Sequence, residues 1–253
     1  MENINQNYLK NHILQNIQIR TYSCIDSTNN EAKRNLDLNP CLFVAEEQTN
    51  GRGRKGRSFY SPKDKGIYMT LLLENNDDLN DIVKITSYAS LCVVNAIKKL
   101  TNIQTDIKWV NDIYYQDKKI CGILIERVLL NDKAYLIIGI GLNLYPFSVS
   151  EELTNIVGFL NFKDDIRNQL IVEIINNLLL FSQNKNSYID EYKKYSLLLN
   201  KEINYYINDE AYHGKVVDID NDAHLIVLND NKIVSLSSGE VTVRLKKDKN
   251  INN

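Results

Sequence analysis

Cysteine and histidine are scarce in this sequence, which limits the cross-links and metal sites it can form. The 253 residues include four cysteines and three histidines. They form no C-x-x-C pair and no cluster, as their positions show: Cys24, Cys41, Cys92, Cys121, His12, His213 and His224. This scatter argues against a disulfide framework or a zinc site, and it fits reduced thiols. Because the N-terminal stretch also lacks the apolar segment and cleavage site of a secretion signal, we expect a cytoplasmic protein.

Long apolar runs and a strong charge of one sign are missing as well. No stretch approaches the roughly 20 apolar residues that cross a bilayer. The formal net charge is only −2, whereas proteins devoted to nucleic acid or to anionic membranes usually carry a basic face. We therefore expect neither nucleic acid nor a membrane as a partner. With 43% hydrophobic residues the chain can bury an ordinary globular core.

Hydrophobic periodicity divides the chain into two parts. Up to residue 199, helix-like and strand-like stretches are mixed. Helices are expected at 1–15, with Ile4, Leu9, Ile13 and Leu14 on one side, and at 28–36, 81–100 and 164–199; strands are expected at 17–22, 41–47, 66–74, 106–110, 118–130 and 134–144. Asn131-Asp132-Lys133 is a natural hairpin turn between the last two strands. From residue 200 to 246, short strands separated by Asn, Asp and Gly turns indicate a small β-barrel or sandwich, and 247–253 reads as a tail.

The segment GRGRKG at 51–56 matches the G-x-G-x-x-G pattern of dinucleotide-binding turns. That fold requires a helix directly after the third glycine, because the helix N-terminus binds the pyrophosphate. Here Gly56 is followed by the turn-like segment RSFYSP, then by a strand, and Glu74 lies at a strand end. The context is strand–loop–strand, so we reject the dinucleotide interpretation.

Three interpretations of the loop remain open on this segment alone. It carries four cations, Arg52, Arg54, Lys55 and Arg57. It could be a solvated basic loop, an RNA-binding Arg/Gly patch, or a loop that folds over a polyanionic small molecule. In the last case guanidinium groups would bind phosphate oxygens, and Phe59 and Tyr60 could stack on a base.

Three further stretches accompany this loop: KWVND at 108–112, KKICGILIE at 118–126 and GIGLN at 139–143. Each alone has an ordinary structural explanation. In this order, together with Ser27-Thr28-Asn29, GRGRKGR and the terminal GEVTVR at 239–244, they make residues 20 to 244 resemble biotin protein ligases. The resemblance implies an α+β fold. It comprises a class II synthetase-like catalytic domain at 1–199, with a mixed, mostly antiparallel sheet packed with helices, and an SH3-like β-barrel at 200–246.

The resemblance also implies a reaction. Biotin and ATP would form biotinyl-5′-AMP, with Mg²⁺, and biotin would then pass to a lysine of a biotin carboxyl carrier protein or domain. A homodimer is compatible with the family. Too few residues precede the first matching strand for the winged helix-turn-helix of repressor relatives, so we expect an enzyme without operator binding.

Site residues follow position by position from the resemblance. The biotin side is implied at Ser27, Thr28, Asn29, Gln48, Arg52, Gly53, Arg54, Lys119 and Gly122, and the nucleotide side at Arg54, Phe59, Lys108, Asn111 and Asn143. Lys119, Arg54 and Asp112 take the catalytic roles, with Asp112 either a Mg²⁺ ligand or a base for the incoming lysine. These residue types suit the chemistry. A neutral ureido ring needs hydrogen bonds, and a carboxylate approaching a phosphate needs fixed cations.

Two details depart from the simplest reading. Val110 stands where the family commonly has Pro, which leaves that turn without a fixed φ. Cys121 lies near Lys119, but a direct adenylate route needs no enzyme nucleophile.

The competing hypotheses are a lipoate or octanoate ligase of the same fold and an RNA-binding module that uses the Arg/Gly loop.

Overall fold

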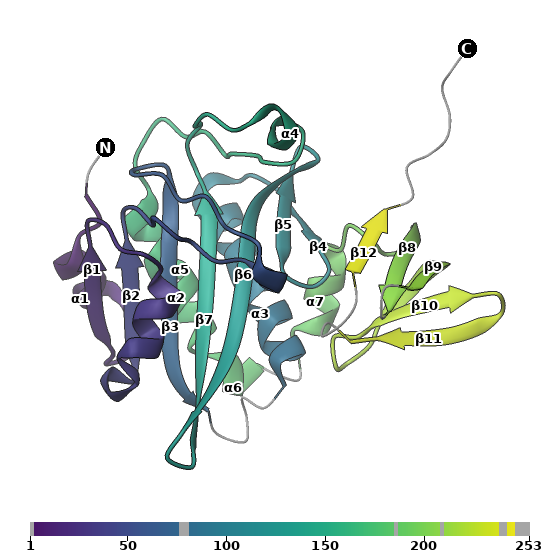
Figure 1. The fold of residues 1–253 in the computed structure, drawn as a ribbon, viewed down its shortest axis with the longest axis horizontal. Helices are drawn as coiled ribbons and strands as arrows, with labels where there is room; N and C mark the ends of the chain where they lie inside the picture. Colours follow the sequence, from purple (N-terminus) through teal and green to yellow (C-terminus); the bar gives the residue numbers. More distant parts are fainter. Residues whose placement is uncertain (1–2, 76–80, 185–186, 208–209, 238–241, 246–253) are drawn as a thin grey trace.

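The computed structural model describes residues 3–75, 81–184, 187–207, 210–237 and 242–245. The chain forms two sheets that lie side by side (Figure 1). The larger sheet has the strand order β1-β2-β3-β7-β6-β5-β4. Its strands are β1 (Gln18–Tyr22), β2 (Cys41–Ala45), β3 (Gly66–Asn75), β4 (Asp106–Lys108), β5 (Asp112–Tyr115), β6 (Lys118–Leu130) and β7 (Lys133–Asn143).

Only the β1–β2 pair is parallel among the neighbouring strands described in this sheet, and the other pairs are antiparallel. The long β6–β7 hairpin turns at Asn131 and Asp132, whose φ angles are 49° and 61°. Asn and Asp tolerate this left-handed region better than other side chains, so the turn forms where it was predicted. The predicted mixed, mostly antiparallel sheet is confirmed.

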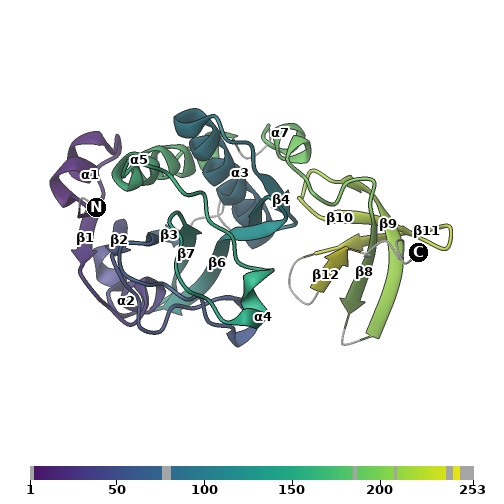
Figure 2. The ribbon, with the colours of Figure 1, turned by 90° about the horizontal axis from the view of Figure 1, so that it is seen from above.

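Helices cover the two faces of this sheet unequally. Figure 2 shows α1 (Gln6–His12), α3 (Ile82–Thr101) and α5 (Arg167–Leu178) on one face, while α2 (Thr28–Arg34) lies on the other. The remaining helical elements are short: η1 (Leu36–Leu38), η2 (Arg54–Gly56), α4 (Glu151–Thr154), α6 (Phe181–Asn184) and α7 (Ile189–Lys194). Among the described residues no helix combines the length and apolar character needed to span a bilayer.

The central helix α3 is specified by its ends and by its apolar face. Asp81 accepts the N–H groups of Val83 and Lys84 at 3.0 and 3.1 Å, which caps the first turn. Asn102 ends the helix in the left-handed conformation. The first helix is shorter than predicted, and Leu14 was wrongly placed on its buried side. It follows the end of α1 and is 86% exposed.

Alternation along β7 prepares one sheet face for a ligand. On the α3 side, Leu136, Ile138, Ile140 and Leu142 join the main core. On the α2 side, Ile137 belongs to a smaller core beneath α2. Beyond it the same face carries Gly139, Gly141 and Asn143, since alternate residues point to the same side. Along β7, the α2 face thus changes from an apolar side chain to two glycines without side chains, and then to the polar amide of Asn143.

The C-terminal sheet contains β8 (Glu202–Ile207), β9 (Glu210–Ile219), β10 (Leu225–Asn229), β11 (Lys232–Leu236) and β12 (Thr242–Leu245), in the order β11-β10-β9-β8-β12. Short strands separated by polar turns were predicted here, and the described residues form five strands in antiparallel pairs. The sheet is tied to the larger part by Trp109, whose Nε1–H donates to Ala223 O at 2.8 Å, and by the Lys84–Asp222 ion pair at 2.6 Å. The domain boundary at residue 199 stays a prediction, and the predicted tail at 247–253 lies outside the described residues.

Candidate active site

A small polar pocket lies beside the start of α2, over β3, β6 and β7. Ser27 caps α2, accepting the Asn30 N–H at 3.4 Å. Gln48 Oε1 accepts the backbone N–H of Thr28 at 2.8 Å, and Gln48 Nε2 donates to Ser61 Oγ at 2.8 Å. Ser27, Thr28 and Gln48 line the pocket, whose volume of about 20 Å³ is roughly that of one water.

Glycines in β7 let side chains lie directly on the sheet. A Cβ on Gly139 would stand 2.1 Å from Asn29 Oδ1, and one on Gly141 would stand 2.5 Å from the Phe59 ring. Any larger residue would displace these side chains. The Phe59 ring therefore covers the floor at Gly141 and limits the volume of the pocket.

The loop at 51–57 has no helix after its third glycine, which confirms the rejection of the dinucleotide turn. Arg54–Gly56 form one 3₁₀ turn, and Arg57 is already extended. Isolated bridges join Arg52 to Ser58 and Gln48 to Ser61, so the loop folds back on itself as a short hairpin. This hairpin carries Arg54 across the sheet to the ends of β5 and β6.

Arg54, Asn111, Asp112 and Lys119 form a connected cluster. Arg54 Nη1 donates to Asn111 Oδ1 at 2.7 Å, and Asn111 Nδ2 donates to Asp112 Oδ1 at 3.1 Å. Lys119 Nζ lies 2.6 Å from the same Asp112 oxygen. Burial lowers the pKa of Arg54, and the Asp112 carboxylate acts in the opposite direction. Two cations thus flank one carboxylate in a partly dry site, where electrostatic interactions are stronger than in water.

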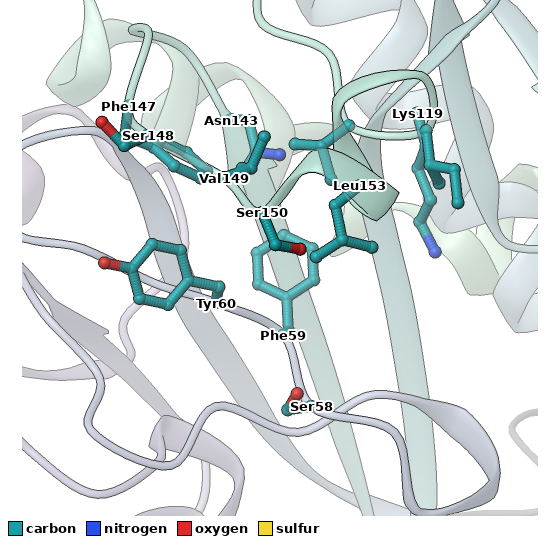
Figure 3. A pocket seen from close by; sticks show the side chains of 12 residues that line it. Ser58, Phe59, Tyr60, Lys119, Asn143, Phe147, Ser148, Val149, Ser150 and Leu153 are labelled. Carbon is teal, nitrogen blue, oxygen red and sulfur yellow. The ribbon is translucent and has the colours of Figure 1, made fainter.

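A second cavity of about 420 Å³ opens on the other side of Phe59 (Figure 3). Lys119 and Asn143 line it together with Phe59 and Tyr60. Asn143 is 5% exposed, and its buried Oδ1 accepts no hydrogen bond from any described residue. Because an unpaired buried amide oxygen is costly, this atom is suited to a ligand donor.

The far wall of this cavity comes from the segment around α4. Phe147, Val149, Leu153, Ile156 and Val157 supply its apolar surface. The segment attaches to β6 at Lys119, whose N–H donates to Ile156 O and whose carbonyl accepts from Gly158, both at 2.8 Å. An apolar wall beside an amide and a lysine suits a flat heterocycle joined to an anionic group.

Most of the residues implied by the resemblance come together here, although their roles stay predictions. Ser27, Thr28, Asn29, Gln48, Arg52, Phe59 and Gly122 line the small pocket, Lys119 and Asn143 the large cavity, and Asn111 and Asp112 join Arg54 to Lys119. Lys108 lies on β4, paired in register with Asp112, and its Nζ is 5.7 Å from the centre of the Tyr114 ring. Gly53 approaches Arg57 within the loop, where its N–H donates to Arg57 O at 2.7 Å.

Sequence reasoning missed several groups that hold the site. Thr70 donates to Asn29 Oδ1 at 2.7 Å, and Glu126 accepts from Asn29 Nδ2 at 3.0 Å. Thr70 lies in an apolar strand, where a single hydroxyl gives no recognisable signal. Glu126 is the last residue of the KKICGILIE motif. Only the alternation of side chains along β6 could have indicated that it lies on the α2 face.

Metal and thiol chemistry have little support in the protein's own groups. The described residues contain no cluster of three His, Cys, Asp or Glu side chains that could bind a metal ion. Asp112 is therefore a single carboxylate, which suits an ion such as Mg²⁺ only if a substrate phosphate completes the coordination shell.

Cys121 is fully buried, and this burial raises the pKa of its thiol well above the ordinary value, so a nucleophilic thiolate is not favoured.

Comparisons with known proteins find relatives for both parts of the chain. The model of the Biotin/lipoate A/B protein ligase family matches residues 21–143, and the model of the Biotin protein ligase C terminal domain matches residues 198–244. The Bifunctional ligase/repressor BirA of Bacillus spizizenii is 30% identical over 230 residues, covering 87% of this chain and 71% of that protein. The Biotin--[acetyl-CoA-carboxylase] ligase of Mycobacterium tuberculosis is 24% identical over 221 residues, covering 83% and 81%.

Among solved structures, the biotin protein ligase from Aquifex aeolicus in complex with biotin and ATP has a TM-score of 0.78. It is 28% identical, and the match covers 90% of this chain and 99% of that one. The predicted resemblance is thereby confirmed by the two matched segments of the sequence and by the fold. The chain belongs to the biotin protein ligase family.

Proposed function

We propose that the protein joins biotin to ATP to form biotinyl-5′-AMP and then transfers biotin to a lysine of a biotin carboxyl carrier protein or domain. The observation that carries this proposal is the position of the cation cluster. Lys119 lines the large cavity, and Arg54 is linked to it through Asn111 and Asp112. The small pocket, lined by Thr28 and Gln48 among others, shares Phe59 with that cavity.

The two binding regions match the two substrates. Hydroxyl and amide groups of Thr28 and Gln48 suit the neutral ureido ring of biotin, and the apolar wall near Asn143 suits adenine. The polar pocket now holds about 20 Å³, so the bicyclic ring of biotin requires the Phe59 side chain to move from Gly141. Phe59 would then be available to cover the nucleotide.

The first step brings two anions into contact. An oxygen of the biotin carboxylate attacks the α-phosphorus of ATP, and pyrophosphate leaves. Arg54 and Lys119 offset the negative charge that accumulates between carboxylate and phosphate, and their attachment to β6 and the folded loop holds them in place before the reaction. The Arg/Gly loop, folded over the mixed anhydride, would exclude water from it.

The second step transfers the acyl group. The ε-amine of the acceptor lysine attacks the biotinyl carbonyl carbon, AMP leaves, and the amine loses a proton. Asp112 is a candidate acceptor for that proton, because its carboxylate lies at the junction of the cluster. Mg²⁺, if bound by Asp112 and the ATP phosphates, would neutralise phosphate charge.

The acceptor class is supported by a relative. The Mycobacterium tuberculosis protein is named as a ligase that acts on acetyl-CoA carboxylase, an enzyme class whose biotin is carried on a dedicated domain. We extend this to the present chain, with residues 1–199 as the catalytic domain and 200–246 as a smaller β domain. Homodimerisation, cytoplasmic location and the lack of operator binding remain predictions.

Biotin-dependent exchange of pyrophosphate into ATP tests the first step. Incubation with biotin, ATP, Mg²⁺ and a biotin carrier domain, followed by mass measurement of the carrier, tests the second. We expect exchange with biotin and addition of one biotinyl group. Exchange with lipoate or octanoate but not with biotin would contradict the proposal. RNA binding that is steeply salt-dependent and independent of biotin would favour the RNA-binding hypothesis.

A further inference from the structure

Glu126 occupies a central position next to the small pocket. It lies on the α2 face of β6, where its side chain is 19% exposed. Its Oε2 accepts from Asn29 Nδ2 at 3.0 Å, and its Oε1 accepts from Lys33 Nζ at 2.7 Å, with Arg52 Nη2 at 3.5 Å. Burial alone would raise the pKa of Glu126, but the hydrogen bonds from Lys33 and Asn29 lower it overall. Glu126 is therefore an ionised group that can only accept hydrogen bonds.

An acceptor-only group orients the amide beside it. Asn29 must turn its NH₂ towards Glu126, so Asn29 Oδ1 faces Thr70 Oγ1 at 2.7 Å. Because Oδ1 is an acceptor, the single hydroxyl hydrogen of Thr70 goes to Asn29. Thr70 Oγ1 is also within donating distance of Thr28 Oγ1, at 2.8 Å, but its one hydrogen cannot reach Thr28 while Asn29 engages it.

Gln48, the other neighbour of Thr28, also has a fixed hydrogen-bond orientation. The backbone N–H of Thr28 can only donate, and it donates to Gln48 Oε1 at 2.8 Å. This fixes Gln48 with its oxygen towards Thr28 Oγ1, at 3.1 Å. Thr28 Oγ1 donates its own hydrogen to Gln48 Oε1. With the Thr70 hydrogen on Asn29, neither neighbour supplies a hydrogen to the Thr28 oxygen.

We propose that Glu126 is a positioning residue that fixes the hydrogen-bond polarity of this pocket, so that Thr28 meets the ligand as an acceptor. The inference rests on the proposed function and deepens it. Thr28 Oγ1 is matched to an N–H of the ureido ring, and a ligand that offers only acceptors at this point is disfavoured. Glu126 acts through Asn29 and Thr70 without contacting the substrate.

The variant Glu126→Gln tests this because it keeps the shape and changes the polarity. Lys33 donates to the Oε1 position and the Arg52 guanidinium lies 3.5 Å from it, so these two cations will draw the carbonyl oxygen of the new amide there. The NH₂ group then faces Asn29 Nδ2, donor against donor, and Asn29 must flip. Thr70 would then receive a hydrogen and donate to Thr28, whose acceptor capacity falls. We expect KM for biotin to rise about tenfold or more, with kcat and KM for ATP within about threefold of wild type.

A second substitution can restore the original polarity. In Glu126→Gln with Asn29→Asp, the amide NH₂ at position 126 donates to one oxygen of the new aspartate, and the other oxygen accepts from Thr70 as Asn29 did. We expect the double variant to recover most of the loss in KM for biotin, whereas Asn29→Asp alone, a carboxylate facing Glu126, should be the weakest binder. Lys33→Met is the matched control, since it removes an ion pair with Glu126 but leaves the Asn29 bond, and its KM should stay within about threefold.

The measurements separate this inference from the proposed function. Wild-type protein without biotin-dependent exchange would refute the proposed function itself. An active wild type with an unchanged biotin KM in Glu126→Gln would overturn only the role of Glu126, as would a double variant whose biotin KM is no lower than that of Glu126→Gln. Thermal unfolding checks each fold. If Glu126→Gln alone fails to fold, the double variant decides, because the polarity argument requires it to fold and to bind biotin within about tenfold of wild type.

Discussion

Removal of the Lys119 ammonium gives the most direct test of the site. Its Nζ lies 2.6 Å from Asp112 Oδ1 and borders the cavity of about 420 Å³. In Lys119→Ala, one of the two cations that offset the approaching carboxylate and phosphate is lost, and Asp112 loses its ion-pair partner. Loss of one preorganised group that stabilises developing charge costs about 2.7–4 kcal/mol, or roughly 10²–10³-fold in rate. We expect adenylate formation to fall by at least that factor.

Stability should change far less than the rate. The Lys119 and Asp112 side chains are 30% and 25% exposed, and such partly solvated ion pairs contribute about 1 kcal/mol or less. For a chain of this size that corresponds to a decrease in Tm of about 2–4 °C. The expected result is therefore a protein that stays folded but forms the adenylate far more slowly than wild type.

Biotin-dependent exchange of labelled pyrophosphate into ATP measures this step without an acceptor protein. Lys118→Ala is the matched control, since it removes the same charge one residue earlier in β6, where the alternation of the strand directs the side chain to the other face. We expect the control to keep exchange within about threefold of wild type. Exchange in Lys119→Ala that matches the control would refute the assignment of the cation cluster.

Three further outcomes follow from the same structure. Arg54→Ala removes the guanidinium that donates to Asn111, so biotinyl-AMP should escape faster, measured as increased labelling of bystander lysines; unchanged retention would contradict the loop's role. Gly139→Ala places a Cβ 2.1 Å from Asn29 Oδ1. We expect KM for biotin to rise about tenfold and the free energy of unfolding to fall by about 1–3 kcal/mol. A wild-type KM and wild-type stability would show that the Asn29 side chain can move freely. A thiol reagent should modify exposed Cys24 in the native protein, while Cys121, buried and with its pKa raised by burial, should react only after denaturation; fast native modification of Cys121 would reopen the thioester hypothesis.

Local signals made much of the fold predictable from the sequence. The helix expected at 81–100 is found at Ile82–Thr101, because a continuous apolar face lies between an Asp cap and a left-handed Asn. The hairpin at Asn131 and Asp132 was also evident, since few side chains accept two successive positive φ angles. Leu14 shows the limit of such signals. Its apolar side chain fits the pattern of α1, but the helix ends at His12 before that pattern can bury it.

Contacts that join distant parts of the chain could not be read in the same way. The wall around α4 contains one short helix without periodicity, and it joins the site through backbone bonds to Lys119 and an edge contact of Phe147 with Tyr60. Glu126 and Asn29 are 97 positions apart, and no spacing rule relates them. The resemblance supplied residues with chemical roles, whereas the neighbours that orient those residues required the sheet register.

Trp109 has a practical consequence for watching this molecule. It is the only tryptophan in the sequence, it is buried, and its indole N–H donates to Ala223 in the C-terminal sheet. Two residues further on, Asn111 begins the cluster that reaches Arg54 and Lys119. Intrinsic fluorescence excited at the red edge of the indole absorption, away from the tyrosines, therefore comes from one ring located between the two sheets and the site. Ligand binding and separation of the C-terminal sheet can both be followed by emission wavelength and quenching, without attaching a dye.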